Sequence, residues 1–212
     1  DSKLTIGALT INSGARLTVD HKSTVAFDSI ENNGTLTLTN GDINYGTMTN
    51  NGTLNLNEGN FTKITNNADG LVNINANGYT LSTNDQLINN GRVNLSAGIT
   101  LNITVEDWAH GVFYNGGILA LNAAQSAFGT GFHNYLGESA GTVNVFKNVT
   151  MKDGSYINTS EETGETIATG TIVVGQDAEL NLMTDTVNYG DVEVVYGSLN
   201  LGSETDGNGG RV

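Results

Sequence analysis

The chain has 212 residues, of which 22 are acidic and 8 are basic, so its formal net charge at pH 7 is −14. This balance argues against a nucleic-acid partner, because phosphate binding needs a basic face, and against adsorption to anionic membranes. The chain has no cysteine and no proline but 28 glycines, which excludes disulfides, thiol catalysis and zinc sites of the cysteine type. No stretch approaches the roughly 18 consecutive apolar residues of a membrane span, so we expect no membrane insertion by this segment.

A repeat of about 20 residues runs along the chain. The stretch ENNGTLTLTNGDI at 31–43 is nearly copied as TNNGTLNLNEGNF at 49–61. Five copies place a glycine before an alternating apolar pair, at spacings of 20, 18, 18 and 21 residues: Gly14, Gly34, Gly52, Gly70 and Gly91. Weaker copies follow at 117–121, 141–145, 180–182 and 199–201. Self-similarity at a fixed period indicates a repeat architecture.

Each copy alternates apolar and polar residues, which predicts a strand with one buried face. Asparagines recur at outward positions and beside glycine, as in Asn33-Gly34 and Asn51-Gly52, where they suit sharp turns. We expect two buried columns, formed by Leu36, Leu38, Leu54, Leu56, Val72, Ile74, Val93 and Leu95.

Two all-β architectures compete for this pattern. Antiparallel hairpins would give a sandwich or a propeller, but blades of about 40 residues with a Trp-Asp-like signature are missing. Near-identical residues at one coil length instead stack above one another in a solenoid, whose coils bury their apolar faces only together. The sequence therefore predicts an all-β parallel β-helix of roughly ten coils with irregular insertions.

One continuous domain accommodates four regions. We expect regular coils over 1–105, aromatic-rich irregular coils over 106–140, further coils over 141–202 with an acidic loop at 152–170, and a Gly-rich tail or linker at 203–212. The N-terminal KLTIGALTI and the C-terminal YGSLNLG are themselves coil-like. Because uncovered strand edges invite pairing, we also expect self-association through the solenoid ends or faces.

The coils NNGTLNL at 50–56 and NNGRVNL at 89–95 resemble those of bacterial autotransporter passenger domains and related surface adhesins. The resemblance covers roughly residues 4–105 and, more loosely, 140–202, and it rests on pattern and composition. It implies a right-handed parallel β-helix, secretion to the bacterial cell surface, and roles in adhesion, self-association or biofilms. We therefore expect an extracellular adhesin or structural module that binds a host or bacterial surface glycan, a protein or another copy of itself.

The window 108–135 departs from the repeat. It holds the aromatic residues Trp108, Phe113, Tyr114, Phe128, Phe132 and Tyr135, together with His110 and His133. Exposed aromatic rings supply flat apolar contact area. We predict a ligand-binding surface formed by Trp108, His110, Tyr114, Phe132, His133 and Tyr135. The alternative is that a wider coil needs larger core side chains.

The sequence gives little support to metal binding or catalysis. The acidic loop (Asp153, Glu161, Glu162, Glu165) and the tail (Glu204, Asp206, Asn208) are the candidate calcium sites. Six or more oxygens must converge on a calcium ion, and this spacing guarantees none, so we expect no cofactor. A polysaccharide-active β-helix enzyme, a lyase or glycoside hydrolase, is the alternative function. Against it, the coils carry Thr and Asn instead of stacked Asp, and no histidine has a partner at a motif spacing, so we expect no catalytic residue.

An ice-binding surface is a third functional class. The row Thr35, Thr37 and Thr39 would supply its hydroxyls, but the next coil has Asn55 and Asn57 at two of these places. The threonine array is therefore not two-dimensional, and we do not favour this class.

Overall fold

The computed structural model describes residues 3–19, 24–39, 43–58, 63–76, 79–82, 86–105, 111–123, 131–136, 138–151, 155–157, 170–182, 186–187 and 191–201. The regular elements in these ranges are strands, and none of the described residues forms a helix long and apolar enough to cross a membrane. Trp108, His110, the acidic residues weighed for calcium and the tail 203–212 lie outside the described residues.

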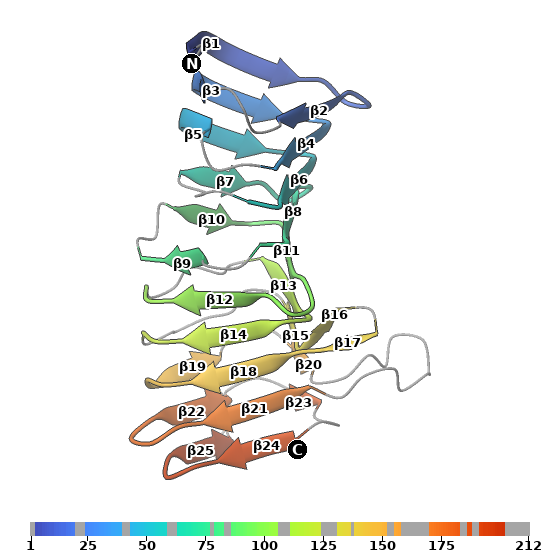
Figure 1. Ribbon diagram of the computed structural model, residues 1–212. Coiled ribbons are helices and arrows are strands. Elements are labelled where there is room, and N and C mark those ends of the chain that lie inside the picture. Colours follow the sequence, from blue (N-terminus) through green and yellow to red (C-terminus); the bar gives the residue numbers. More distant parts are fainter. Residues whose placement is uncertain are drawn as a thin grey trace.

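Parallel sheets run along the solenoid, with the strands stacked from the N-terminal to the C-terminal coil (Figure 1). Sheet A contains β1 (Lys3–Ile11), β3 (Thr24–Asn32), β5 (Ile43–Asn50), β7 (Ile64–Asn66) and β10 (Leu87–Asn89). Sheet B contains β2 (Arg16–Val19), β4 (Thr35–Leu38), β6 (Thr53–Leu56), β8 (Leu71–Ile74), β11 (Arg92–Leu95), β13 (Val112–Asn115), β15 (Gly131–His133), β20 (Ser155–Ile157) and β23 (Thr186–Val187).

Two further parallel sheets complete the later coils. Sheet C contains β9 (Tyr79–Leu81), β12 (Thr100–Ile103), β14 (Ile118–Leu121), β18 (Thr142–Val145), β21 (Thr171–Val174) and β24 (Asp191–Val194). Sheet D contains β19 (Val149–Met151), β22 (Glu179–Leu182) and β25 (Ser198–Leu201). The predicted parallel solenoid is confirmed, with somewhat fewer coils than the ten expected.

The repeat period sets the strand register. In sheet B, Leu54 pairs with Leu36 on one side and Val72 on the other, at separations of 18 residues. All eight side chains predicted for the two inner columns are at most 4% exposed. The columns are therefore confirmed, and the column of Val93 continues through Phe113 to Phe132 in the later coils of sheet B.

Asparagines form a second kind of inner column. At the corner between sheets A and B, the side chains of Asn32, Asn50, Asn66 and Asn89 are fully buried; we call them the inner asparagine ladder. The Nδ2 atoms of Asn32, Asn50 and Asn66 each donate to the Oδ1 of the next asparagine, at 2.7, 2.7 and 2.8 Å. A shorter ladder joins Asn115 to Asn134 at 2.8 Å. The first asparagine of Asn-Asn-Gly is thus a core residue, a position that the repeat pattern did not predict.

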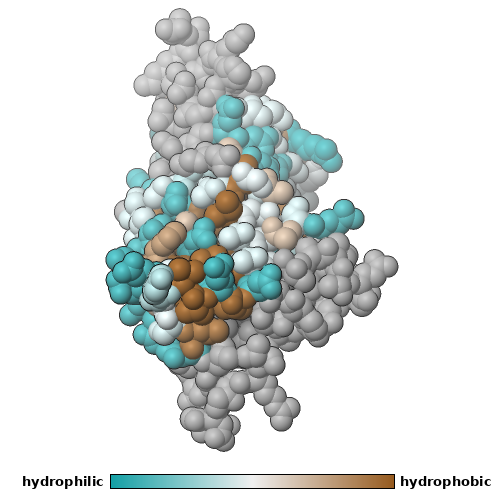
Figure 2. All heavy atoms as spheres, turned by 60° about the horizontal axis from the view of Figure 1, so that its bottom comes forward, coloured by the Kyte–Doolittle hydropathy of each residue, from teal (hydrophilic) through white to brown (hydrophobic). Residues whose placement is uncertain are grey.

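The C-terminal coil leaves part of the core uncovered. Val194 continues the column of Val174, yet it is 43% exposed whereas Val174 is completely buried. Figure 2, which brings this end forward, shows hydrophobic side chains gathered among hydrophilic ones. Self-association through the ends stays a prediction.

Candidate functional site

The outer face of sheet B presents two columns of side chains. Inward residues alternate with outward ones along each strand, and the register stacks each outward set. One column contains Arg16, Thr35, Thr53, Leu71, Arg92 and Val112. The other contains Thr18, Thr37, Asn55, Asn73, Asn94, Tyr114 and His133.

Side-chain hydrogen bonds link the second column. The Nδ2 of Asn55 donates to Thr37 Oγ1 at 3.1 Å. In the same direction Asn73 donates to Asn55, and Asn94 donates to Asn73, both at 2.8 Å. We call Asn55, Asn73 and Asn94 the outer amide column. Each amide oxygen points toward the later coils, and the last of them, Asn94 Oδ1, accepts a hydrogen bond of 2.7 Å from Arg92 Nε.

Aromatic rings replace the amides on the next two strands. Tyr114 stacks on His133 with ring centroids 4.2 Å apart and planes 8° from parallel. Tyr135 meets both rings edge-on, at 5.8 and 5.7 Å. We call Tyr114, His133 and Tyr135 the ring cluster. The Arg92 guanidinium carbon lies 3.9 Å from the centre of the Tyr114 ring, in the range of a cation–π contact.

A hairpin holds Tyr135 over the face of the sheet. β16 (Tyr135–Leu136) pairs antiparallel with β17 (Ser139–Ala140), and Figure 1 shows this pair extending sideways from the stacked coils. Gly116 lies beneath it. A Cβ at position 116 would be only 2.8 Å from the Cβ of Leu136, a separation that real Cβ contacts do not reach. The absence of a side chain at Gly116 therefore lets the hairpin approach.

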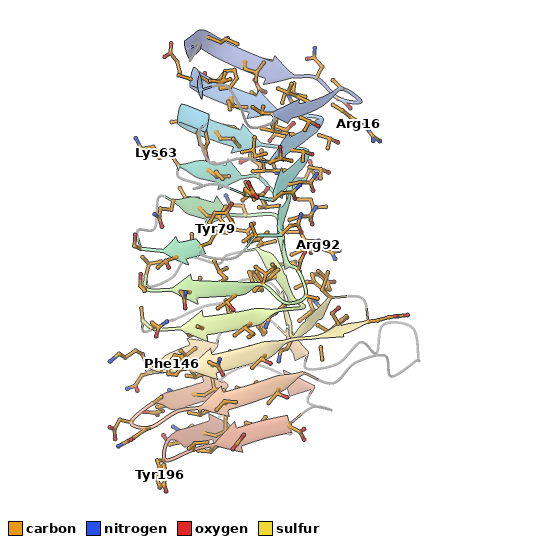
Figure 3. All side chains as sticks on the ribbon, in the orientation of Figure 1. Arg16, Lys63, Tyr79, Arg92, Phe146 and Tyr196 are labelled. Atoms are coloured by element: carbon orange, nitrogen blue, oxygen red, sulfur yellow. The ribbon has the colours of Figure 1, made fainter. Side chains whose placement is uncertain are left out.

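An open hollow lies beside the ring cluster. It has a volume of about 340 Å³ and is lined by Ala68, Asn90, Gly91, Arg92, Val112 and Tyr114. Arg92 and Asn90 are exposed, and Tyr114 is half-buried. His133 and Tyr135 are 8% and 6% exposed, so they present little surface to a ligand. Figure 3 shows Arg92 and Arg16 on the same side of the solenoid, with Lys63 on the opposite side.

The predicted site residues fall into three groups. Tyr114, His133 and Tyr135 come together as the ring cluster. Phe132 faces the other way, is 2% exposed, and stacks on Phe113 in the core with centroids 5.8 Å apart. Phe132 is therefore a large core side chain, as the alternative interpretation of this window expected. Trp108 and His110 lie outside the described residues.

Arg92 was missed in the prediction. Its signal in the sequence is a departure from the repeat, because NNGRVNL has Arg where NNGTLNL has Thr at the first outward position of the strand. Tyr114 departs in the same way, standing in register with Asn94 and Asn73. Both departures become adjacent only when the coils are stacked.

The electrostatics of the site come from Arg92. None of the six residues lining the hollow is acidic, and within the described ranges no three His, Asp or Glu residues gather to hold a metal ion. A resolved pKa shift occurs elsewhere: burial raises the pKa of Tyr79 to about 12, with contributions from Tyr45 and Glu58.

No family model, no curated protein and no solved structure matches this chain. The chemistry of the site must therefore be argued from its own residues.

Proposed function

We propose that this chain is an extracellular adhesion module of a bacterial surface protein, and that it binds a surface ligand through sheet B beside Arg92 and Tyr114. The observation that carries the proposal is the stack of Arg92, Tyr114 and His133 next to an open hollow. Aromatic and arginine side chains are enriched at binding hot spots. Strands also hold a site more rigidly than loops do.

The packing of the cluster favours binding over catalysis. The three rings contact one another, and His133 and Tyr135 are almost completely buried. A general base must come within hydrogen-bond reach of the substrate, and these two side chains are poorly placed for that. The surface open to a ligand is the hollow with Arg92, Val112 and Tyr114. Among the residues that the structure describes, no specific observation favours the polysaccharide-active enzyme.

Substitution of Tyr114 tests the proposal. We expect wild-type protein to bind a subset of glycans on a glycan array and to adhere to cells displaying them. Tyr114→Ala should weaken that binding at least about tenfold, which corresponds to about 1.4 kcal/mol, because it removes the platform under Arg92 and one wall of the hollow. Far-ultraviolet circular dichroism should stay unchanged.

Thr18→Ala is the matched control. Thr18 is exposed in the same outward column, five strands before Tyr114, and neither belongs to the outer amide column nor lines the hollow. It should bind like the wild type. Unaltered binding by Tyr114→Ala, or a wild-type protein that binds neither glycans nor cells, would contradict the proposed function.

A further inference from the structure

The ligand chemistry follows from the way in which Arg92 is held. We propose that the hollow binds a single carboxylate on an otherwise uncharged carbohydrate, such as one uronic acid residue in an oligosaccharide. The proposal rests on the proposed function for the location of the site and adds the class of ligand.

Arg92 is fixed by two contacts that leave its outer edge available. Its Nε donates to Asn94 Oδ1 at 2.7 Å, and its guanidinium group lies over the Tyr114 ring. Among the described residues, no hydrogen-bond partner occurs for its Nη1 and Nη2 atoms. Those atoms carry four N–H donors in a planar fork, which matches the two oxygens of a carboxylate. Since the side chain is already ordered, less conformational entropy is lost on binding.

The amides beneath Arg92 stabilise its charge without cancelling it. Every member of the outer amide column points its oxygen toward the later coils, so the negative ends of these dipoles face Arg92. No carboxylate lines the hollow. Although the chain has a formal charge of −14, the Arg92 guanidinium group has no acidic neighbour in the hollow. A ligand can therefore supply its counter-ion.

The size of the hollow favours a sugar over a protein. About 340 Å³ lies at the lower end of the range for small-ligand sites, whereas a stable protein partner would cover about 800 Å² on each side. The lining combines the Asn90 amide and the Gly91 backbone with the apolar Val112. Hydroxyl groups and C–H faces of a sugar ring match those two kinds of surface.

The net charge restricts the ligand to one carboxylate. A densely charged polysaccharide would bring further negative groups against an acidic protein, and at physiological salt repulsion acts over about 8 Å. We therefore expect the site to prefer an isolated acidic residue over a polyanion.

The test compares matched ligands by isothermal titration calorimetry on the whole 212-residue chain. The probes are a neutral oligosaccharide carrying one glucuronic acid residue, its methyl ester, heparin and poly-glutamate. We expect the free acid to bind about tenfold or more tightly than the ester, in line with a charge-assisted bidentate contact. Raising the salt from about 50 to 200 mM should change the affinity by no more than about fourfold, since only one ion pair forms.

Three variants locate the contact. Arg92→Gln should bind the acid and the ester equally, and Arg92→Lys should recover only part of the preference because it lacks the planar fork. Arg16→Gln is the control: Arg16 is exposed in the same outward column, four strands earlier, and this variant should behave like the wild type. Equal melting temperatures for the three variants would show that the fold is intact.

The outcomes separate the two proposals. The carboxylate site is overturned if the protein binds glycans or cells without preferring the acid, or if Arg92→Gln retains the preference. Either result leaves the adhesion module standing. Tightest binding to heparin with a steep salt dependence overturns the single-carboxylate ligand in favour of a polyanion. Tightest binding to poly-glutamate overturns it in favour of an acidic protein. A chain that binds no glycan, cell or probe overturns both proposals.

Discussion

Asn50 shows how a polar side chain is accommodated in the core of this solenoid. Its Nδ2 donates to Asn66 Oδ1 at 2.7 Å and also lies within hydrogen-bond distance of the backbone oxygens of Gly52 and Leu71. Its Oδ1 accepts from Asn32. Burying an amide without such partners costs a few kcal/mol. Asn50 therefore depends on the asparagines in the coils before and after it.

We predict that Asn50→Ala lowers the free energy of unfolding by about 2–4 kcal/mol, because it leaves the amides of both Asn32 and Asn66 short of a buried partner. Asn55→Ala, on the half-buried outer amide column, should cost less than about 1 kcal/mol, since water can replace its partners. Urea denaturation of the two variants provides the comparison. Equal losses would mean that the buried ladder is no more important than the surface column.

Sequence patterns predicted the apolar residues of the core better than the polar ones. Leu36 and Leu54 alternate with threonine, and alternation alone assigns their face. Asn50 stands beside Asn51 and Gly52, a combination typical of turns, and its burial depends on asparagines 18 and 16 residues away. The ring cluster was predictable in part, because aromatic residues are conspicuous in a Thr/Asn repeat. Arg92 departs from the repeat at one position, but its place over the Tyr114 ring becomes evident only when the coils are stacked.

At the scale of elements, the corner from sheet A into sheet B is a close approach of two backbones. A Cβ on Gly52 would lie 2.2 Å from the backbone oxygen of Gly34. Leu71 and Thr53 continue the same corner by donating to the backbone oxygens of Gly52 and Gly34, both at 2.8 Å. Glycine is thus required at this corner because no space remains for a side chain.

We predict that Gly52→Ala lowers the melting temperature by several degrees, since the corner must move apart and strain the inner asparagine ladder. For a chain of this size, about 1 kcal/mol corresponds to about 2–4 °C. Gly7→Ala in β1 is the control, because the nearest atom to its added Cβ, an Asp28 carboxylate oxygen, is 3.8 Å away. Thermal unfolding followed by circular dichroism measures both. A Gly52→Ala protein as stable as Gly7→Ala would show that the corner relaxes freely.

Element boundaries were less predictable than element type. The period of 18 residues fixed the pairing of β4, β6 and β8. Sheet C begins only at β9, and the β16–β17 hairpin interrupts the path from β15 to β18. These features depend on coils of unequal length, which a fixed repeat period cannot predict.

For the whole molecule, the shared register makes one coil a removable unit. β3 pairs with β5, and β4 with β6, at the same offset of 18 residues. We predict that deleting residues 35–52, which joins Gly34 to Thr53, gives a folded solenoid shorter by one coil. Leu54 would occupy the place of Leu36, and Asn66 would follow Asn32 in the ladder.

Deleting residues 35–51 is the matched control. It shifts β6 by one residue and turns its leucines toward solvent, because side chains alternate faces along a strand. We expect a cooperative thermal transition for the first deletion and a lost or broadened one for the second. Cooperative unfolding of both proteins at similar temperatures would show that register does not govern the assembly.

The shared register of neighbouring coils has a consequence for the evolution of the gene. Near-identical stretches such as 31–39 and 49–57 are sites at which recombination can exchange one copy for another. An unequal exchange between them adds or removes a whole coil, which lengthens or shortens the body by about 4.8 Å and leaves every other contact in place. Selection can therefore change how far along the solenoid Arg92 and Tyr114 lie from the first coil, without altering either residue. Inherited length variants of this chain should differ by multiples of a coil.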